Sequence, residues 1–249
     1  MEPILALTRS RSRATTPYNA ESWEAELLQA GLADKYPGIP RGLREGFIFN
    51  YPQIHQTQTP PNKPALAEFA EVFKGNVATE IAKGRYIGPF SRLELEAAIG
   101  PFQSSPFDII PKPGKPSKFR LLQNLSFPLT PSLTFPNPSI NSQVDSDDFP
   151  CTWGTFATLC LVISRLPPGS QAAVRDVAEA YRTIPLHHSQ WPATVVRIEE
   201  DTFYADLYAC FGAGPAAGGY GHVADAGADL FRSKGILPIS KWVDDHIFF

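Results

Sequence analysis

Hydrophobic side chains recur at helical spacing along five stretches of the chain, and each stretch predicts a helix. In the clearest of them, Leu66 and Phe73 fall on one face. In another, Ser91 stands three residues before Glu94, which is typical of a capping box at a helix N-terminus. The five stretches are residues 21–33, 64–83, 91–99, 152–166 and 215–233. We expect the helix over residues 152–166 to be buried, because it is largely apolar.

Short runs of β-branched, aromatic and aliphatic residues between these stretches predict strands. Two of the runs, residues 107–111 and 119–123, flank a basic turn, and this arrangement is typical of a β-hairpin. The other predicted strands are residues 171–177, 194–198, 203–208 and 239–243. Strands mixed with packed helices predict an α+β fold.

Three segments lack periodic apolar positions and are expected to be irregular. Residues 1–20 are polar, with arginines alternating with serine and threonine, so we expect a loose, solvated tail. Residues 36–63 are rich in proline, and residues 126–150 are expected to form a long proline-rich loop.

Composition and charge limit the classes of protein to which this chain can belong. The chain has 249 residues, a net charge of −3 and 43% hydrophobic residues, as in an ordinary folded protein. It shows neither a signal peptide nor an apolar run of membrane-spanning length, so we expect an intracellular protein of cytoplasm or nucleus, with no membrane partner. The three cysteines lack metal-ligand spacing and are expected to be buried thiols. Because the net charge is slightly negative, any nucleic-acid binding must depend on local basic patches.

Three aspartates stand at the ends of predicted strands. Asp176 ends one strand, and Asp244 and Asp245 follow another. Taken singly, each is more typical of a cap or a turn. If the two strands are neighbours, however, three carboxylates come together, and such a cluster is costly unless cations neutralise it. Carboxylate oxygens suit Mg²⁺, and a pair of such ions is the usual arrangement for attack at phosphorus, in polymerases and in phosphohydrolases.

The segments around these aspartates resemble the sequence motifs of reverse transcriptases. Residues 176–186, in which Tyr181 stands five positions after the Asp, resemble motif A, and residues 242–245, Trp-Val-Asp-Asp, resemble motif C. Between them, residues 211–221 resemble motif B, and upstream residues 110–121 resemble the basic fingers hairpin. A phosphohydrolase would explain the aspartates but neither the tyrosine nor the hairpin.

Shorter segments indicate the type of element. Residues 125–128, 139–141 and 188–192 are most similar to retrotransposons of the tyrosine-recombinase (DIRS) type, and the motifs are also similar to gypsy-type and retroviral enzymes. The resemblance implies a fingers-like region followed by a polymerase palm, an antiparallel sheet backed by helices. The expected division is an irregular N-terminal extension in 1–60, fingers in 61–170 and palm in 171–249.

The resemblance also implies roles for the acidic and aromatic residues. Asp176 and Asp244 would be the principal catalytic metal ligands, with Asp245 as the weaker third, for two Mg²⁺ ions or Mn²⁺ in their place. Tyr181 would be the steric gate beneath the sugar, so that deoxynucleoside triphosphates are favoured. Glu179 is expected to be an ion-paired surface residue rather than a further ligand.

Basic residues of the fingers hairpin would hold the nucleotide. By resemblance, Lys118 and Arg120 would meet the triphosphate, Arg through its planar fork and Lys as a point charge. Lys112 and Lys115 would serve the same cluster or the template phosphates, although a solvated lysine is as good a reading of each.

Motif B implies the contact with a template and primer. Phe211, Gly212 and Gly214 would lie there, with Gly218 and Gly219 following, because glycine lets the backbone approach a base pair closely. The motif departs from the family at the start of its helix, where Pro215 and Ala217 stand. The two glycines inside that helix would each weaken it by about 1 kcal/mol.

The implied activity is template-directed DNA synthesis on an RNA or DNA template with a primer. The sequence ends at Phe249, so we expect the second strand of the Asp-Asp hairpin to have barely begun. We expect the thumb and ribonuclease H regions of the family to be absent from this chain, and a duplex therefore to bind weakly. The alternative is an inactive, truncated retroelement remnant with at most weak nucleic-acid binding.

Overall fold

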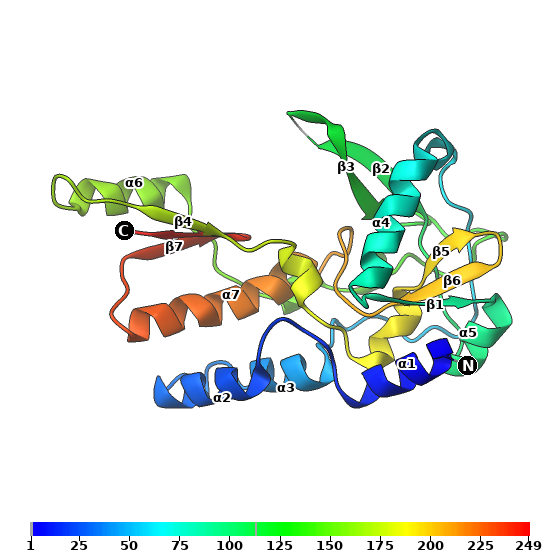
Figure 1. Ribbon diagram of the computed structural model, residues 1–249, viewed down its shortest axis with the longest axis horizontal. Helices are drawn as coiled ribbons and strands as arrows, with labels where there is room; N and C mark the ends of the chain where they lie inside the picture. Colours follow the sequence, from blue (N-terminus) through cyan, green and yellow to red (C-terminus); the bar gives the residue numbers. More distant parts are fainter. Residues whose placement is uncertain (1, 113) are drawn as a thin grey trace.

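The computed structural model describes residues 2–112 and 114–249 as helices packed with antiparallel sheets, as the sequence predicts. The molecule is elongated, with two of its sheets near one end and the third near the other (Figure 1). Helices α1 (Glu2–Ser12), α2 (Ala20–Gln29) and α3 (Gly38–Glu45) run along one side, and α7 (Ala216–Ser233) lies between them and the third sheet. No helix in the described ranges is both long and apolar enough to cross a bilayer.

The first sheet has the strand order β1-β6-β5, with antiparallel neighbours. Its strands are β1 (Tyr86–Phe90), β5 (Val196–Glu199) and β6 (Thr202–Asp206). Helix α4 (Ala70–Ala82), preceded by a 3₁₀ turn, packs beside it, and α5 (Arg92–Ile99) follows β1. The predicted capping box is confirmed, because the Ser91 side chain accepts from the Glu94 N–H and the Glu94 carboxylate accepts from the Ser91 N–H.

The predicted hairpin is confirmed as β2 (Phe107–Lys112) and β3 (Lys115–Gln123). It projects from the body of the molecule next to α4 (Figure 1). Two aromatic pairs hold its base against the helix and the preceding turn. The ring centroids of Phe73 and Phe107 are 5.3 Å apart, and those of Phe69 and Phe119 are 4.9 Å apart.

The third sheet contains the predicted Asp-Asp hairpin and has the order β4-β8-β7. Its strands are β4 (Ala173–Asp176), β7 (Ile239–Trp242) and β8 (Asp245–Phe248). The expectation that the second hairpin strand has barely begun is wrong. β8 is a four-residue strand at the centre of the sheet, paired along its length with both neighbours.

The N-terminal segment is helical where we expected a loose tail and an irregular stretch. Helices α1 (Glu2–Ser12) and α3 (Gly38–Glu45) lie in those two segments, whereas α2 (Ala20–Gln29) confirms the helix predicted over residues 21–33. The reason for α1 and α3 is burial of apolar side chains, Leu7 and Leu43, in the same core that contains Trp191 and Tyr220. Leu7 is the one buried residue of α1, while Ile4 and Leu5 are exposed, so no apolar periodicity reveals the helix.

Helix α6 (Phe156–Arg165) exists as predicted, but it is not buried. None of its described residues is buried, and Phe156 is 84% exposed. The expectation of buried thiols likewise holds only for Cys210, because Cys160, on this helix, is exposed. By contrast α7 (Ala216–Ser233) is predicted correctly and lies largely in the core.

Candidate active site

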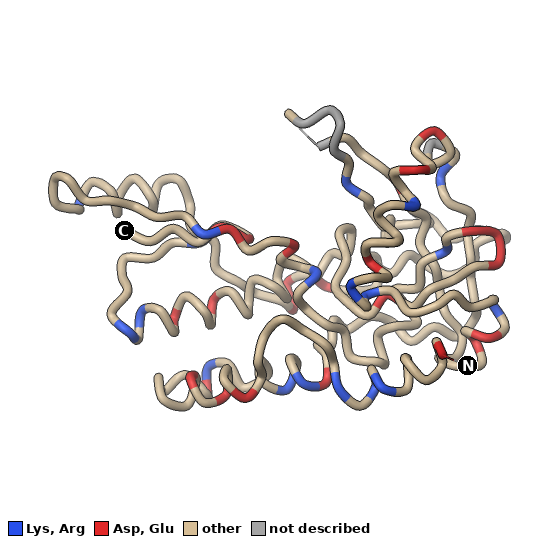
Figure 2. The backbone as a smooth tube through the Cα atoms, in the orientation of Figure 1, with Lys and Arg blue, Asp and Glu red and all other residues tan. Residues whose placement is uncertain are grey.

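The sheet β4-β8-β7 brings the three aspartates together. Asp176, the last residue of β4, pairs directly with Asp245, the first residue of β8. Directly opposed residues in an antiparallel pair have Cβ atoms about 4.5–5.5 Å apart and side chains on one face. The third carboxylate, on Asp244, stands in the adjoining turn, whose carbonyl accepts from the Val177 N–H at 2.9 Å. Figure 2 shows acidic residues where these strands end, near the middle of the molecule.

The turn between β7 and β8 is tight and strained. Trp242 pairs with Asp245, so only Val243 and Asp244 connect the strands. Val243 has φ of 50°, in the left-handed region that a β-branched residue rarely adopts. The strand pairing on both sides imposes this conformation and so holds Asp244 at the tip of the hairpin.

A cleft of about 710 Å³ opens beside this turn, between the hairpin β2–β3 and the third sheet. Asp244 and Val243 line one side, and Arg120 of β3 lines the other. The rings of Tyr181 and Phe211 lie between them. The cleft therefore joins residues of the hairpin β2–β3 with residues from the three segments that resemble motifs A, B and C, which are far apart in the sequence.

Tyr181 is held in the cleft by other aromatic rings. It lies on a 3₁₀ turn (Ala180–Thr183), with ring centroids 5.2 Å from Phe211 and 6.2 Å from Tyr220. Burial, and then the negative charge of Asp244, raise the pKa of the Tyr181 hydroxyl, so it stays protonated at neutral pH. The half-buried ring is thus fixed in position next to the acidic turn.

The basic residues of the hairpin are placed in part. Arg120 is exposed on β3 opposite Ile110, with its side chain at the cleft. Lys112 ends β2, and Lys115 and Lys118 lie on β3. The side chains of these three lysines lie outside the described part of the chain.

The motif B glycines make room for the chain itself. A Cβ on Gly212, whose φ is 112°, would lie 2.0 Å from the Gln123 carbonyl oxygen. The Gln123 N–H donates to the Phe211 carbonyl at 3.2 Å, so β3 is fastened to this turn. On Gly214 the nearest atom to such a Cβ would be the Ser146 hydroxyl, at 3.2 Å. Our reason for these glycines, close approach to a base pair, does not hold for Gly212, where the space is already filled.

At the glycines inside α7, too, another part of the chain fills the space that a side chain would need. A Cβ on Gly218 would meet the Phe149 carbonyl oxygen at 2.1 Å, and one on Gly219 would meet the Phe49 ring at 2.4 Å. The long loop before α6 and the segment after α3 therefore pack directly on this helix. Burial of these neighbours offsets the helix-weakening effect of glycine.

The donor set fits a hard divalent cation by its chemistry. Asp176 and Asp244 both raise the pKa of Tyr220, after the larger effects of burial and of Tyr18, so their charges bear on the same ring. Mg²⁺ needs only one or two protein carboxylates when phosphate oxygens and water complete its shell. Within residues 2–112 and 114–249, however, no three His, Cys, Asp or Glu side chains are arranged to enclose an ion.

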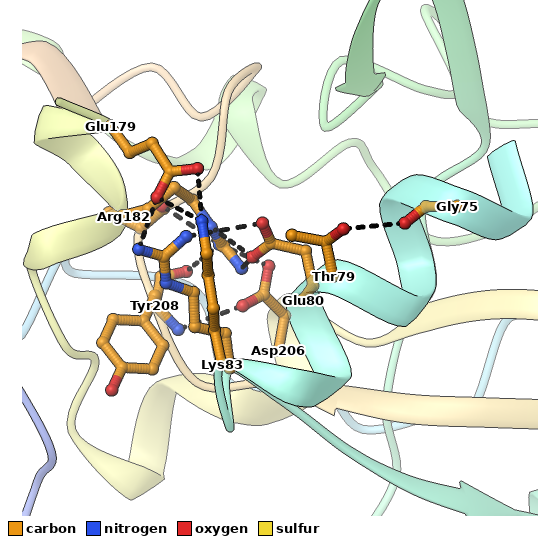
Figure 3. A network of polar contacts seen from close by, with 10 residues as sticks. Gly75, Thr79, Glu80, Lys83, Glu179, Arg182, Asp206 and Tyr208 are labelled. Carbon is orange, nitrogen blue, oxygen red and sulfur yellow. Dashed lines mark hydrogen bonds and ion pairs between the residues drawn. The ribbon is translucent and has the colours of Figure 1, made fainter. Parts of the chain in front are cut away.

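A set of buried ionic residues in the wall of the cleft is not predicted by the sequence. Arg182 and Asp206 are buried, with only 6% and 0% of their surface exposed, and Glu80 of α4 joins them (Figure 3). In the sequence, the one indication of these buried charges is Asp206, a charged residue in the apolar stretch of β6. Glu179 is ion-paired, as expected: its carboxylate accepts from Lys83 at 2.7 Å and from Arg85 at 2.9 Å. These bonds lower the pKa of Glu179 although burial acts in the opposite direction.

Comparison with known proteins gives matches among solved structures alone. No protein-family model matches the sequence, and no curated protein matches it. The native protease-reverse transcriptase of prototype foamy virus aligns with 99% of this chain at a TM-score of 0.53 and 14% identity. Its CSH mutant aligns with 98% of the chain at a TM-score of 0.51 and 14% identity. The fold is reverse-transcriptase-like.

The reverse-transcriptase-like region is a part of those larger proteins. The chain spans 29% of the length of each of these two foamy virus proteins. A third foamy viral protease-reverse transcriptase, solved with double-stranded DNA, matches 99% of this chain over 38% of its own length, with 16% identity and a TM-score of 0.48. The predicted α+β fold is therefore confirmed, while the resemblance to retrotransposons of the tyrosine-recombinase type stays a prediction.

Proposed function

We propose that this chain is a reverse-transcriptase-like domain that carries out template-directed DNA synthesis by two-metal nucleotidyl transfer. The observation that carries the proposal is the pairing of Asp176 with Asp245 next to Asp244, which lines a cleft that Arg120 and Tyr181 also line. A phosphohydrolase would need the carboxylates alone. A nucleoside triphosphate also needs groups that contact its sugar and its phosphates. The aromatic rings and the basic hairpin across the cleft would supply them.

The residues of the cleft would divide the nucleotide among them. Arg120, with Lys118 and Lys112 of the same hairpin, would bind the triphosphate through charge-assisted hydrogen bonds. Tyr181 would lie under the sugar, where its fixed ring leaves little room for a 2′ hydroxyl. Asp176 and Asp244, with Asp245 as the weaker third, would hold two Mg²⁺ ions, or Mn²⁺ in their place. Such ions would supply activation of the primer 3′ hydroxyl and stabilisation of the leaving pyrophosphate.

Template and primer would occupy the side of the cleft near motif B. Phe211 is 41% exposed there and presents an apolar ring on which a base can stack. Gly212, against which β3 is fixed, and Gly214 would lie beside the nucleic acid. The parent element, by the resemblance of the sequence, would be a retrotransposon of the tyrosine-recombinase type with an RNA or DNA template.

Nucleotide incorporation on a primed template tests the proposal. We expect Mg²⁺-dependent extension by the wild-type chain, and loss of at least about 100-fold in rate in Asp176→Ala and Asp244→Ala, since removal of electrostatic groups has effects of this order. Asp34→Ala, at an exposed aspartate between α2 and α3, serves as the matched control. Equal extension by Asp176→Ala and wild type would refute the metal assignment.

A second candidate is nucleic-acid binding without catalysis. The observation that favours it is the absence, among the described residues, of three side chains arranged to enclose a metal. It predicts that the chain binds a primed template and that Arg120→Ala weakens binding, with no extension under any divalent ion. Binding and extension measured on the same template separate the two candidates.

A further inference from the structure

Arg182 is the residue next to Tyr181; it lines the cleft too, but its side chain is buried among a set of acceptors (Figure 3). Its Nη1 donates to the Asp206 carboxylate at 2.8 Å. Its Nη2 and Nε donate to the same Glu80 oxygen at 2.7 and 3.1 Å. One guanidinium thus joins α4 to the end of β6.

The same guanidinium also reaches the chain that leads to Phe211. Nη1 lies 3.3 Å from the Tyr208 carbonyl oxygen and 3.2 Å from that of Ala209. Phe211 stands two residues beyond Ala209, and its ring is the partner of the Tyr181 ring. Arg182 therefore fixes both the backbone next to Tyr181 and the backbone that leads to Phe211. The rings of these two residues pack against each other in the cleft.

Further ion pairs extend this arrangement to the surface. Arg85 contacts Glu80 at 3.4 Å and Glu179 at 2.9 Å, and Glu179 also pairs with Lys83. Three positive and three negative residues therefore alternate from the surface inward to Asp206. Glu179 begins the 3₁₀ turn that carries Tyr181, so this turn is held at its start as well as at Arg182.

The planar fork of arginine is what this position requires. Lysine would keep the charge but has no rigid set of donors that can meet Glu80, Asp206 and two carbonyls together. Apolar residues in such a place are often as stabilising as a buried ion pair, so stability alone does not account for the arrangement. What the fork adds is a fixed geometry for the segments that bear Tyr181 and Phe211.

We propose that Arg182 is a positioning residue: it holds the Tyr181 and Phe211 rings at the spacing that excludes a ribose, and so sets sugar selectivity in the cleft. This inference rests on the proposed function of the same site. Arg182 itself acts through its neighbours, because its donors are all directed at the protein.

Binding measured without chemistry tests the inference. The protein is assembled in Mg²⁺ with a primed template whose primer ends in a dideoxynucleotide and whose next template base is thymine. The dissociation constants of dATP and ATP are then compared for wild type, Arg182→Lys, Tyr181→Ala and the double variant. Arg197→Lys is the matched control, because Arg197 on β5 also donates to backbone carbonyls, those of Thr59 and Glu199, but does not line the cleft.

We expect the preference for dATP to fall by about tenfold in Arg182→Lys, a change that corresponds to about 1.4 kcal/mol. Tyr181→Ala should lose the same preference, and the double variant should lose no more, because both changes act through one ring. Arg197→Lys should keep the wild-type ratio. A folded Arg182→Lys protein with the wild-type ratio would overturn the inference.

Folding is checked first by the melting temperature. If Arg182→Lys does not fold, Glu80→Gln replaces it, since Asp206 still neutralises Arg182 in that variant. A reduced dATP preference supports the inference, and an unchanged ratio overturns it. If the wild-type complex binds neither nucleotide, the proposed function fails for every variant, which is a different result from a failure at Arg182 alone.

Discussion

Asp176 and Asp245 lie directly opposite each other on the neighbouring strands β4 and β8. Like charges in this relationship repel, and nothing in the strand pairing itself compensates for them. The sheet is held instead by β8, which pairs with β4 on one side and with β7 on the other. The pairing thus carries a cost in stability at a position where a bound cation would remove it.

We therefore predict that Asp176→Asn stabilises the protein in the absence of divalent ions. Removing one charge of the opposed pair should raise the free energy of unfolding by up to about 1 kcal/mol. Added Mg²⁺ should raise the melting temperature of the wild type more than that of Asp176→Asn, because the ion binds the folded carboxylates. Thermal unfolding with and without Mg²⁺ measures both effects. The exposed Asp34→Asn should change neither, and a wild type indifferent to Mg²⁺ would contradict the metal assignment.

The strain at Val243 gives a second prediction. Its φ of 50° suits glycine and not a β-branched residue, so Val243→Gly should stabilise the hairpin by about 1 kcal/mol. Val174→Gly, at an exposed position within the extended strand β4, should instead destabilise by about 0.5–1 kcal/mol. Denaturant unfolding of both variants provides the measurement. If Val243→Gly is the less stable of the two, the turn is not strained.

Local pattern was sufficient to predict the elements that bear the site. The hairpin β2–β3 and helix α7 follow from apolar periodicity with turn residues at their ends, and the Asp-Asp turn follows from two carboxylates inside an apolar stretch. That Asp176 meets Asp245 required one assumption, neighbouring strands, and the sheet confirms it.

What the pattern could not give depends on contacts between distant segments. Arg182 lies 102 residues from Glu80 and 24 from Asp206, so no local spacing reveals their network. The apolar sequence of α6 says nothing about what covers it, and the helix is exposed. In α1 only Leu7 is buried while Ile4 and Leu5 are exposed, so the sequence shows no apolar stripe that would indicate docking.

The close approach of β3 to the motif B turn gives a third prediction. In Gly212→Ala the new Cβ would lie 2.0 Å from the Gln123 carbonyl oxygen, at a φ of 112°. Gly235→Ala is the matched control, because Gly235 also has a positive φ, of 78°, but no atom lies within 4 Å of an added Cβ. The control should lose about 1–2 kcal/mol from backbone strain alone. Gly212→Ala should lose more, and equal losses in chemical denaturation would show that β3 yields without cost.

Asp206 gives the last prediction, a pH dependence of stability. Burial raises the pKa of its carboxyl from 3.8 to about 6, although Arg182 acts in the opposite direction. Because the folded protein then binds this proton more tightly than the unfolded chain, the stabilisation from this group is complete below about pH 4 and is lost as the pH rises through about 6. A difference of about two pKa units corresponds to about 3 kcal/mol.

The free energy of unfolding of the wild type, taken relative to Asp206→Asn, should therefore fall by about this amount between pH 4 and pH 7. Relative to Asp201→Asn, a change at an exposed aspartate on the turn before β6, the wild type should show no comparable fall, because both proteins keep Asp206. A wild type and an Asp206→Asn protein with parallel pH profiles would show that Asp206 does not titrate in this range, and that its charge is held at all these pH values by Arg182.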